Sequence, residues 1–421
     1  MSCCLVLSGR LASVVSVTGP EQPSLNQRTP GGSEPAVVPR VLVDLSVAAA
    51  GGAGTYSIGF ARGLIESADR HKDQVVVLSD AGWAAEHAEV VSTLRAEGVT
   101  VVAQAFPPPG SWKTRLTRGR VVARIVRENH VEVAYFPRDA APRLRVRTAV
   151  LLNNRYAWAS FASGQAIGGK VPAFLLRVMA WLTARRAAVV LAVSETMATA
   201  AHGARVDDIV YHGCWLPEHH RDDSEAVGVD GRPVRVLMVA NLIENKRVEV
   251  VLEGLAAARR AGGSWELRVH GTRMDPAYAD RVEALSHELL GESALRPPVS
   301  AAQLVEAYQR ADVLVMGGAF ESFCHPLVEG MRSGAVVVAP ESDLVREICG
   351  DVAVTYREGD SADLARALGV AADERLARSR AGVERSRQFD WVQTVDQTLA
   401  AVRSAIDSGP GPGPGPRSGI A

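Results

Sequence analysis

Residues 313–340 read VLVMGGAFESFCHPLVEGMRSGAVVVAP, and this stretch predicts how the chain folds. Apolar runs of strand length stand at both ends, and the segment between them has helical features. Pro326 suits the first helical position, and Gly334 suits the end of the helix. Continuous apolar strands joined by a helix are typical of parallel strands buried on both faces. The stretch therefore predicts a strand–helix–strand unit of an α/β domain.

The same alternation of strand and helix runs through most of the chain. The strands predicted in the first half are residues 40–47, 75–80, 99–104, 131–136, 148–153, 188–194 and 208–213. Those predicted in the second half are residues 235–241, 266–271, 313–317, 335–340 and 352–356. Two such sets predict two doubly wound, Rossmann-like domains, whose ligands bind beyond the carboxyl ends of the strands.

Composition divides the rest of the chain. Residues 1–38 are expected to be a disordered leader, and the Gly/Pro repeat of 408–421 a disordered tail. Between them we expect a first domain at 39–218, a polar linker at 219–233 and a second domain at 234–390. Residues 391–407 are expected to form a last helix.

The bulk composition excludes several classes of protein. The formal net charge of -1 gives no reason to expect a nucleic-acid partner. Five cysteines, an odd number without a C-x-x-C pair suited to zinc, are typical of a reduced cytoplasmic protein. No stretch approaches the ~20 apolar residues that span a bilayer. The N-terminus resembles a secretion signal only faintly, because Arg10 interrupts its apolar run.

Three strand-to-helix loops carry candidate chemistry. In the first, Gly52 and Gly54 precede a helix expected to begin near Thr55, where backbone amides can bind an anion. A dinucleotide site is a rival interpretation, but GGAG does not match G-x-G-x-x-G. A tight turn without a ligand is the other alternative.

The second loop follows strand 235–241. Asn245 is a plausible N-cap, which would put Lys246 and Arg247 in the first helical turn, where cations oppose the helix dipole. A diphosphate docked there would explain Lys246, and an ordinary solvated lysine is the alternative. Arg247 is expected to face solvent more than ligand.

The third loop is the strongest signal. The amides around Phe323, Cys324 and His325 begin a helix and can hold phosphate. Glu321 and Glu329 can accept hydrogen bonds from neutral sugar hydroxyls. First-turn acids often merely complement the dipole, but that interpretation leaves Glu321 unexplained.

These segments together resemble the retaining GT-B glycosyltransferases of family 4. ESFCHPLVEG (321–330) closely resembles that family's E-x7-E motif. Other resemblances, in the family's order, are GGAGTY (51–56), VSETMATAAHGARVDDIVYHG (193–213), VANLIENKRVEVVLEGL (239–255), DLVREICGD (343–351) and RQFDWVQTVDQTLAAV (387–402). The resemblance implies two Rossmann-like domains facing across a cleft, the first for the acceptor and the second for a nucleotide-sugar donor, with the helix at 391–407 crossing back to the first.

The resemblance also implies residue roles. Glu321 would contact the transferred sugar, Glu329 the nucleotide ribose and Lys246 the diphosphate. Gly52 and Gly54 would lie near the phosphates, with Tyr56 following them toward the sugar or acceptor.

Four positions depart from the family pattern. Asn241 stands where the family often has an arginine, so a two-cation phosphate clamp would need a substitute, for which Arg247 is a weak candidate. Ser322 and Cys324 replace glycines of the motif, which suggests a slightly tighter loop. Asn154 stands at the place of a sugar-facing histidine.

The implied chemistry is transfer with retention at the anomeric carbon. Double displacement needs a nucleophilic carboxylate, and none stands out in the first domain. A front-face reaction fits better, with Lys246 and the amides of 322–325 stabilising the departing diphosphate. No D-x-D triplet occurs, so neither a metal nor another cofactor is expected.

The acceptor is less constrained. A small molecule, as in aminoglycoside-like bacterial natural products, competes with a cell-envelope lipid or polysaccharide. The basic segments 112–127 and 170–186 can touch an anionic membrane or a phosphorylated acceptor, or can be ordinary solvated helices. Membrane association is not favoured. More remote alternatives are a nucleotide-sugar epimerase of the same fold, a Rossmann oxidoreductase and a non-catalytic relative that binds a nucleotide sugar.

Overall fold

The computed structural model describes residues 38–46, 52–106, 112–158, 173–221 and 232–407. The predicted leader, most of the predicted linker and the predicted tail lie outside these residues. Within them, no helix combines the length and apolar character needed to cross a membrane.

The first sheet has seven parallel strands in the order β3-β2-β1-β4-β5-β6-β7. Its strands are β1 (Val41–Asp44), β2 (Val75–Asp80), β3 (Thr100–Gln104), β4 (Val133–Phe136), β5 (Arg147–Leu152), β6 (Val189–Ala192) and β7 (Asp208–Ile209). The connecting helices are α1 (Gly52–Glu66), α2 (Ala81–Glu86), α3 (Ala88–Ala96), α4 (Trp112–Glu128), α5 (Ala173–Arg186) and α6 (Glu195–Ala200), with 3-10 turns η1 (Lys72–Gln74) and η2 (Arg155–Ala157).

The second sheet has six parallel strands in the order β10-β9-β8-β11-β12-β13. Its strands are β8 (Val234–Val239), β9 (Trp265–His270), β10 (Leu295–Arg296), β11 (Val313–Val315), β12 (Val336–Pro340) and β13 (Val354–Tyr356). Its helices are α7 (Val248–Arg260), α8 (Pro276–Leu290), α9 (Ala301–Arg310), α10 (His325–Arg332), α11 (Asp343–Cys349), α12 (Ser361–Asp373) and α13 (Arg375–Ser386), and the 3-10 turn η5 (Glu244–Lys246) precedes α7.

The two-domain α/β prediction is confirmed, and every predicted strand is present. The runs were recognisable because the strands are buried on both faces: Val41, Leu42 and Val43 of β1 are fully buried, as is most of β12. Only β10 was missed, because two residues are too short to form a sequence pattern. Both sheets reverse their strand order beside one strand, β1 in the first and β8 in the second. Ligands of such sheets bind at these switch points.

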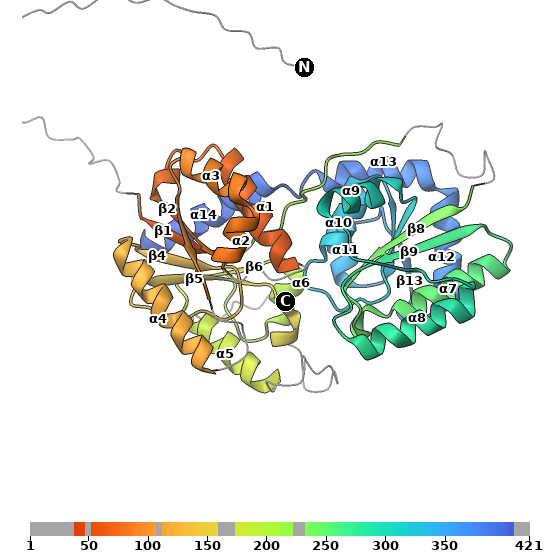
Figure 1. Cartoon of the computed structure of the whole chain (residues 1–421), viewed down its shortest axis with the longest axis horizontal. Coiled ribbons are helices and arrows are strands. Elements are labelled where there is room, and N and C mark those ends of the chain that lie inside the picture. The colour runs from red at the N-terminus through yellow and green to blue at the C-terminus, as the bar shows by residue number, and fades with distance from the viewer. Residues whose placement is uncertain (1–37, 47–51, 107–111, 159–172, 222–231, 408–421) are drawn as a thin grey trace, which may run out of the picture. The chain divides into compact units, whose positions relative to one another are not determined.

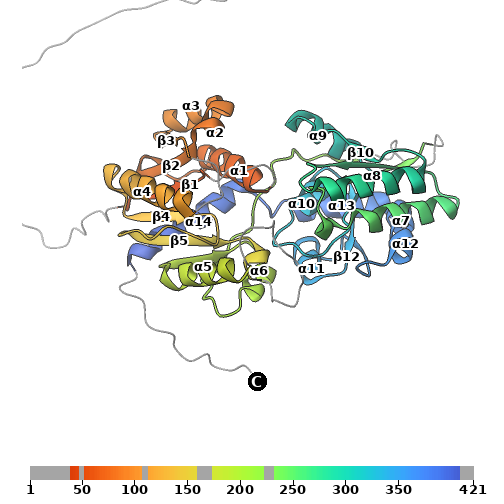
Figure 2. The same ribbon diagram turned by 60° about the horizontal axis from the view of Figure 1, so that its bottom comes forward.

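The last helix, α14 (Trp391–Asp407), packs on the first sheet rather than the second. It lies along α1 and contacts β4, β5 and β6, and both views show this blue helix among the orange and yellow elements (Figures 1 and 2). The packing is close, because a Cβ atom on Gly59 of α1 would lie 2.1 Å from Cε2 of Trp391. The chain therefore returns to its first domain after completing the second.

Candidate active site

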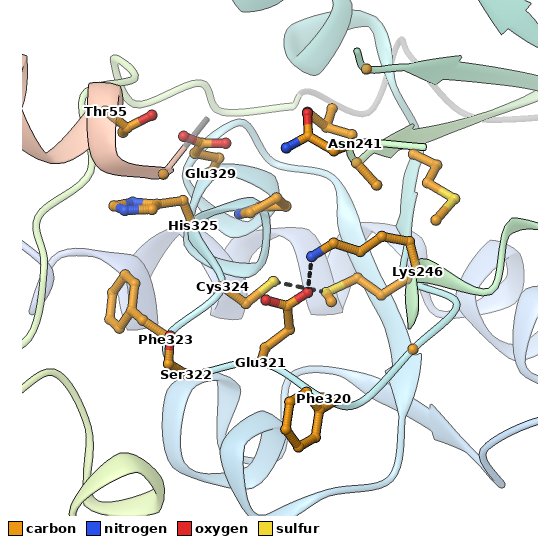
Figure 3. Close-up of a pocket in the computed structure, with 18 of the residues that line it drawn as sticks. Thr55, Asn241, Lys246, Phe320, Glu321, Ser322, Phe323, Cys324, His325 and Glu329 are labelled. Carbon is orange, nitrogen blue, oxygen red and sulfur yellow. Dashed lines mark hydrogen bonds and ion pairs between the residues drawn. The ribbon is translucent and has the colours of Figure 1, made fainter. Parts of the chain in front are cut away.

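A cavity of about 610 Å³ lies at the carboxyl ends of the strands, lined by residues of both sheets' domains. Of the predicted site residues, it is lined by Gly52, Asn154, Asn241, Lys246, Glu321, Ser322, Phe323, Cys324, His325 and Glu329. Figure 3 shows Asn241, Lys246, Glu321 and His325 converging there. The loops after β1, β8 and β11 therefore meet at one site.

Lys246 reaches the cavity from the turn before α7 and not from the helix itself. Asn245 does not cap that helix. Instead η5 comes first and Arg247, at φ 46°, takes the N-cap position. The tight turn packs against the next loop, where a Cβ on Gly318 would lie 2.1 Å from the Asn245 carbonyl oxygen. The predicted first-turn placement of Lys246 is wrong for this reason.

The Lys246 ammonium forms an ion pair with the Glu321 carboxylate (Figure 3). The two side chains are 22% and 18% exposed, so both remain open to a ligand. Burial favours the neutral amine, but the adjacent Glu321 carboxylate outweighs it and holds the pKa of Lys246 above its ordinary value. The cavity thus contains a charged ammonium whose present partner is a carboxylate.

The Glu321 loop is held from the other domain by hydrogen bonds. Arg155 Nη1 donates to the Glu321 carbonyl oxygen at 3.2 Å and to that of Ala319 at 3.4 Å. Ser322 Oγ donates to the Asn153 carbonyl oxygen at 2.7 Å, and Ser194 Oγ donates to that of Ser322 at 2.6 Å. Ser322, one of the two departures from the glycine pattern, therefore ties the loop to the first domain.

The helix α10 begins directly after a left-handed residue, Cys324, at φ 66°. Glycine adopts this conformation without strain, so the cysteine costs about 1 kcal/mol here. Its Sγ lies 3.1 Å from the sulfur of Met316. The bend directs the start of α10 into the cavity.

His325 is the first residue of α10 and contacts the first domain. A Cβ on Gly52 would lie 3.7 Å from its Cδ2, and His212 Nδ1 lies 3.2 Å from its Nε2. Burial lowers the pKa of His325 to about 4 and that of His212 well below its usual value. Both imidazoles are therefore neutral near pH 7, and one donates a hydrogen bond to the other.

Glu329 lies one turn into α10 and is only 5% exposed. Trp215 Nε1 donates to its Oε1 at 2.7 Å, and the Tyr308 hydroxyl donates to its Oε2. Burial raises the pKa of Glu329, although both hydrogen bonds oppose the rise. The carboxylate is fixed in position and still lines the cavity.

The second domain resembles a known family of protein domains. The model described as "Glycosyl transferases group 1" matches residues 220–384. Those residues are a glycosyl transferases group 1 domain. The D-inositol 3-phosphate glycosyltransferase of Mycolicibacterium smegmatis is 35% identical to this chain over 113 residues, which are 26% of this chain and 26% of that protein. The chain therefore matches about a quarter of that relative's length.

Solved structures match most of the length of the chain. The Anabaena protein HepE, in complex with UDP and glucose, has a TM-score of 0.65 at 17% identity and covers 87% of this chain and 100% of its own. Sucrose-phosphate synthase from Thermosynechococcus elongatus has a TM-score of 0.67 at 14% identity, covering 88% and 99%. At such low identity the likeness concerns the fold alone. It supports the GT-B fold for this chain.

Three predicted site residues do not line the cavity. Arg247 is exposed and directs its Nε toward Glu358 Oε1 at 3.6 Å, outside the main cavity. Gly54 lies within α1, and its neighbours Ala53 and Thr55 line the cavity instead. Arg247 was expected to face solvent more than ligand, whereas nothing in the residue type of Gly54 distinguished it from its neighbours.

Tyr56 is a core residue. It is 3% exposed, its hydroxyl lies 2.9 Å from that of Tyr135, and its ring packs edge-on against Trp391. It lines a second cavity of about 280 Å³, together with Asp139 and Asn154. Tyr56 does not line the main cavity, because α14 and β4 enclose the ring, and its expected place facing the sugar or acceptor stays a prediction.

Residues that sequence reasoning missed also line the main cavity. They include Arg155, His212, Trp215, His270 and Phe320. His270 ends β9, so the rule that ligands bind at strand ends was a usable signal. Arg155 directly follows the asparagine pair 153–154, and nothing in its residue type distinguished it from the many other arginines.

Within the described ranges, no group of three or more His, Cys, Asp or Glu side chains lies close enough together to hold a metal ion. The expected independence from metal stays a prediction.

Proposed function

We propose that this protein is a retaining glycosyltransferase that moves a sugar from a nucleoside-diphosphate sugar to a hydroxyl of a small-molecule acceptor. One observation carries the proposal. Lys246, Glu321, Glu329 and the start of α10 converge on one cavity at the switch points of two Rossmann-like sheets. Such a cavity offers donors for phosphate and acceptors for neutral hydroxyls.

The donor has a natural orientation in this cavity. Lys246 and the amides at 322–325 hold the diphosphate, and Glu321 accepts hydrogen bonds from the sugar hydroxyls. Glu329, fixed by Trp215 and Tyr308, accepts from the ribose. Because Lys246 forms an ion pair with Glu321, the diphosphate and the sugar of the donor would meet beside that ion pair. The bond between them is the one that breaks.

Retention follows a front-face route. The bond from the anomeric carbon to the departing phosphate oxygen breaks, and the acceptor oxygen bonds to the same face. The acceptor proton passes to the departing phosphate. Among the described residues, those that line the cavity from the first domain include no Asp or Glu, which supports a route without a nucleophilic carboxylate. Lys246 stabilises the charge that develops on the diphosphate.

The acceptor proposal rests on the second cavity. Its volume of about 280 Å³ suits a small molecule, and it shares Ala53, Asn153 and Asn154 with the donor cavity. The mycobacterial relative is named for a small phosphorylated polyol, which supports the same class. A natural-product setting rests on the sequence alone. A cell-envelope acceptor is the alternative, favoured by Leu182 of α5, which is 39% exposed beside basic Arg185 and Arg186.

A thermal-shift screen with UDP, GDP, dTDP, ADP and NAD tests the donor class. At about 100 times Kd a ligand adds about 2.7 kcal/mol to the free energy of unfolding, so one diphosphate should raise Tm by several degrees. A rise with NAD and none with any diphosphate would overturn the proposal. Incubating the matched nucleotide sugar without acceptor separates the epimerase alternative, which would invert a sugar centre by itself.

A further inference from the structure

The diphosphate end of the cavity is short of positive charge. Lys246 is already paired with Glu321, and Asn241, which lines the same region, is neutral (Figure 3). A nucleoside diphosphate brings at least two negative charges, which are costly to desolvate unless they are paired. Arg247, which follows Lys246 in the sequence, lies outside the cavity and pairs with Glu358.

Arg155 is the cation that enters from the opposite side. It opens the η2 turn after β5 and lines the donor cavity. Its guanidinium lies 4.7 Å from the centre of the Phe320 ring. Nη1 donates to two carbonyl oxygens of the Glu321 loop. Carbonyl oxygens and an aromatic face orient the guanidinium without neutralising it.

The remaining capacity of Arg155 is considerable. Across the described part of the chain it makes no ion pair with any Asp or Glu, and its Nε and Nη2 make no hydrogen bond. A guanidinium presents five donors in a planar fork that matches phosphate oxygens. An oriented, half-buried and uncompensated arginine in a cavity is arranged for an anionic ligand.

We propose that Arg155 is the second cation that binds the donor diphosphate, acting with Lys246 from the facing domain. The inference rests on the proposed function and adds a residue to it. Lys246 contacts the carboxylate of Glu321 and Arg155 contacts its carbonyl oxygen, so the two cations flank one residue. The donor would then contact both domains. Its phosphates would bind beside Asn154, the residue before Arg155, which also lines the acceptor cavity.

A purely positioning role makes a different prediction. If Arg155 only held the 319–321 loop, removing its charge while keeping a hydrogen-bond donor would leave diphosphate affinity nearly unchanged. Arg155→Gln does this, because the amide can still donate to a carbonyl and pack on Phe320. Arg155→Lys is the matched control, because it keeps the charge and loses the planar fork.

The experiment is calorimetric titration with the diphosphate, among UDP, GDP, dTDP and ADP, that binds the wild-type protein, and with its parent nucleoside. We expect Arg155→Gln to weaken the diphosphate about 10- to 100-fold and the nucleoside less than about 3-fold. Arg155→Lys should retain most of the affinity. Arg155→Gln combined with Asn241→Arg, which returns a cation to the facing wall, should recover at least about tenfold.

Two results overturn the inference. One is unchanged diphosphate affinity in Arg155→Gln, and the other is an equal loss for diphosphate and nucleoside. If Arg155→Gln does not fold, the salt dependence of diphosphate binding in Arg155→Lys and the wild type is compared, and identical affinity and salt slope in the two also overturn it. A wild-type protein that binds no diphosphate at all would instead refute the proposed function.

Discussion

Replacing Glu321 by glutamine should tighten the binding of a nucleoside diphosphate while abolishing most transfer. Without a ligand, the Glu321 carboxylate forms an ion pair with the Lys246 ammonium. A phosphate oxygen sharing that ammonium would lie ~4.6 Å from the carboxylate oxygen, where two unit charges repel by about 3.6 kcal/mol at an effective dielectric constant of about 20. Because both side chains are about one-fifth exposed, solvent reduces this to about 1 to 2 kcal/mol. Glu321→Gln should therefore bind the free diphosphate about 5- to 30-fold more tightly.

The assay is calorimetric titration with the free diphosphate and with the corresponding nucleotide sugar. Since Glu321 is proposed to hold the sugar, the advantage of nucleotide sugar over diphosphate should shrink in the variant. Glu358→Gln is the matched control, because it removes the same charge from the Arg247 pair outside the cavity. Equal or weaker diphosphate binding by Glu321→Gln would refute the shared-ammonium reasoning.

Three further predictions concern stability. Arg247 is exposed and has the left-handed φ of 46°, which glycine adopts without strain. The free energy of unfolding of Arg247→Gly should therefore be about 1 kcal/mol higher than that of Arg247→Ala. Equal denaturation midpoints for the two variants would count against the left-handed turn. His325 has a pKa of about 4 when folded against 6.5 unfolded, so below pH 6.5 the unfolded state binds a proton that the native state does not. Between pH 7 and pH 4 the wild type should lose about 3 kcal/mol more than His325→Gln in denaturant titrations, and parallel pH profiles would contradict the assignment. Gly59→Ala should lower the unfolding free energy by about 1 to 3 kcal/mol through overlap with Trp391, whereas Gly369→Ala, with no atom within 4 Å, should raise it by up to about 1 kcal/mol. A thermal melt in which both alanine variants behave alike would argue against the α1–α14 packing.

The fold could be predicted because parallel strands buried on both faces leave continuous apolar runs. The run at 75–80 matches β2 residue for residue. The third loop was equally legible, since Pro326 and Gly334 mark the bounds of a helix and two glutamates beside its start have few structural reasons to be there. Gly334 indeed follows α10 at φ 71°.

The backbone turn at Lys246 and Arg247 could not be predicted, although Lys246 was expected to bind a ligand and Arg247 to face solvent more than ligand. Lys246 and Arg247 are adjacent and alike in charge, yet a left-handed turn sends one into the cavity and the other to Glu358. The turn depends on the close packing of Asn245 against Gly318, which is 73 residues away in the chain (318 - 245) and invisible to a local pattern. Arg155 was missed for a similar reason, because its partners at 319–321 belong to the other domain.

The central claim is that the cavity around Lys246 binds the diphosphate of a nucleotide sugar. Its most direct test is the dissociation constant of the selected diphosphate for the wild type, Lys246→Ala and Arg281→Ala. Arg281 is the matched control, an exposed cation of the same domain that pairs with Glu244 on the surface. We expect Lys246→Ala to lose about 2 to 3 kcal/mol of binding, about 30- to 150-fold, and Arg281→Ala to bind like the wild type. Equal affinity of Lys246→Ala and the wild type would contradict the account.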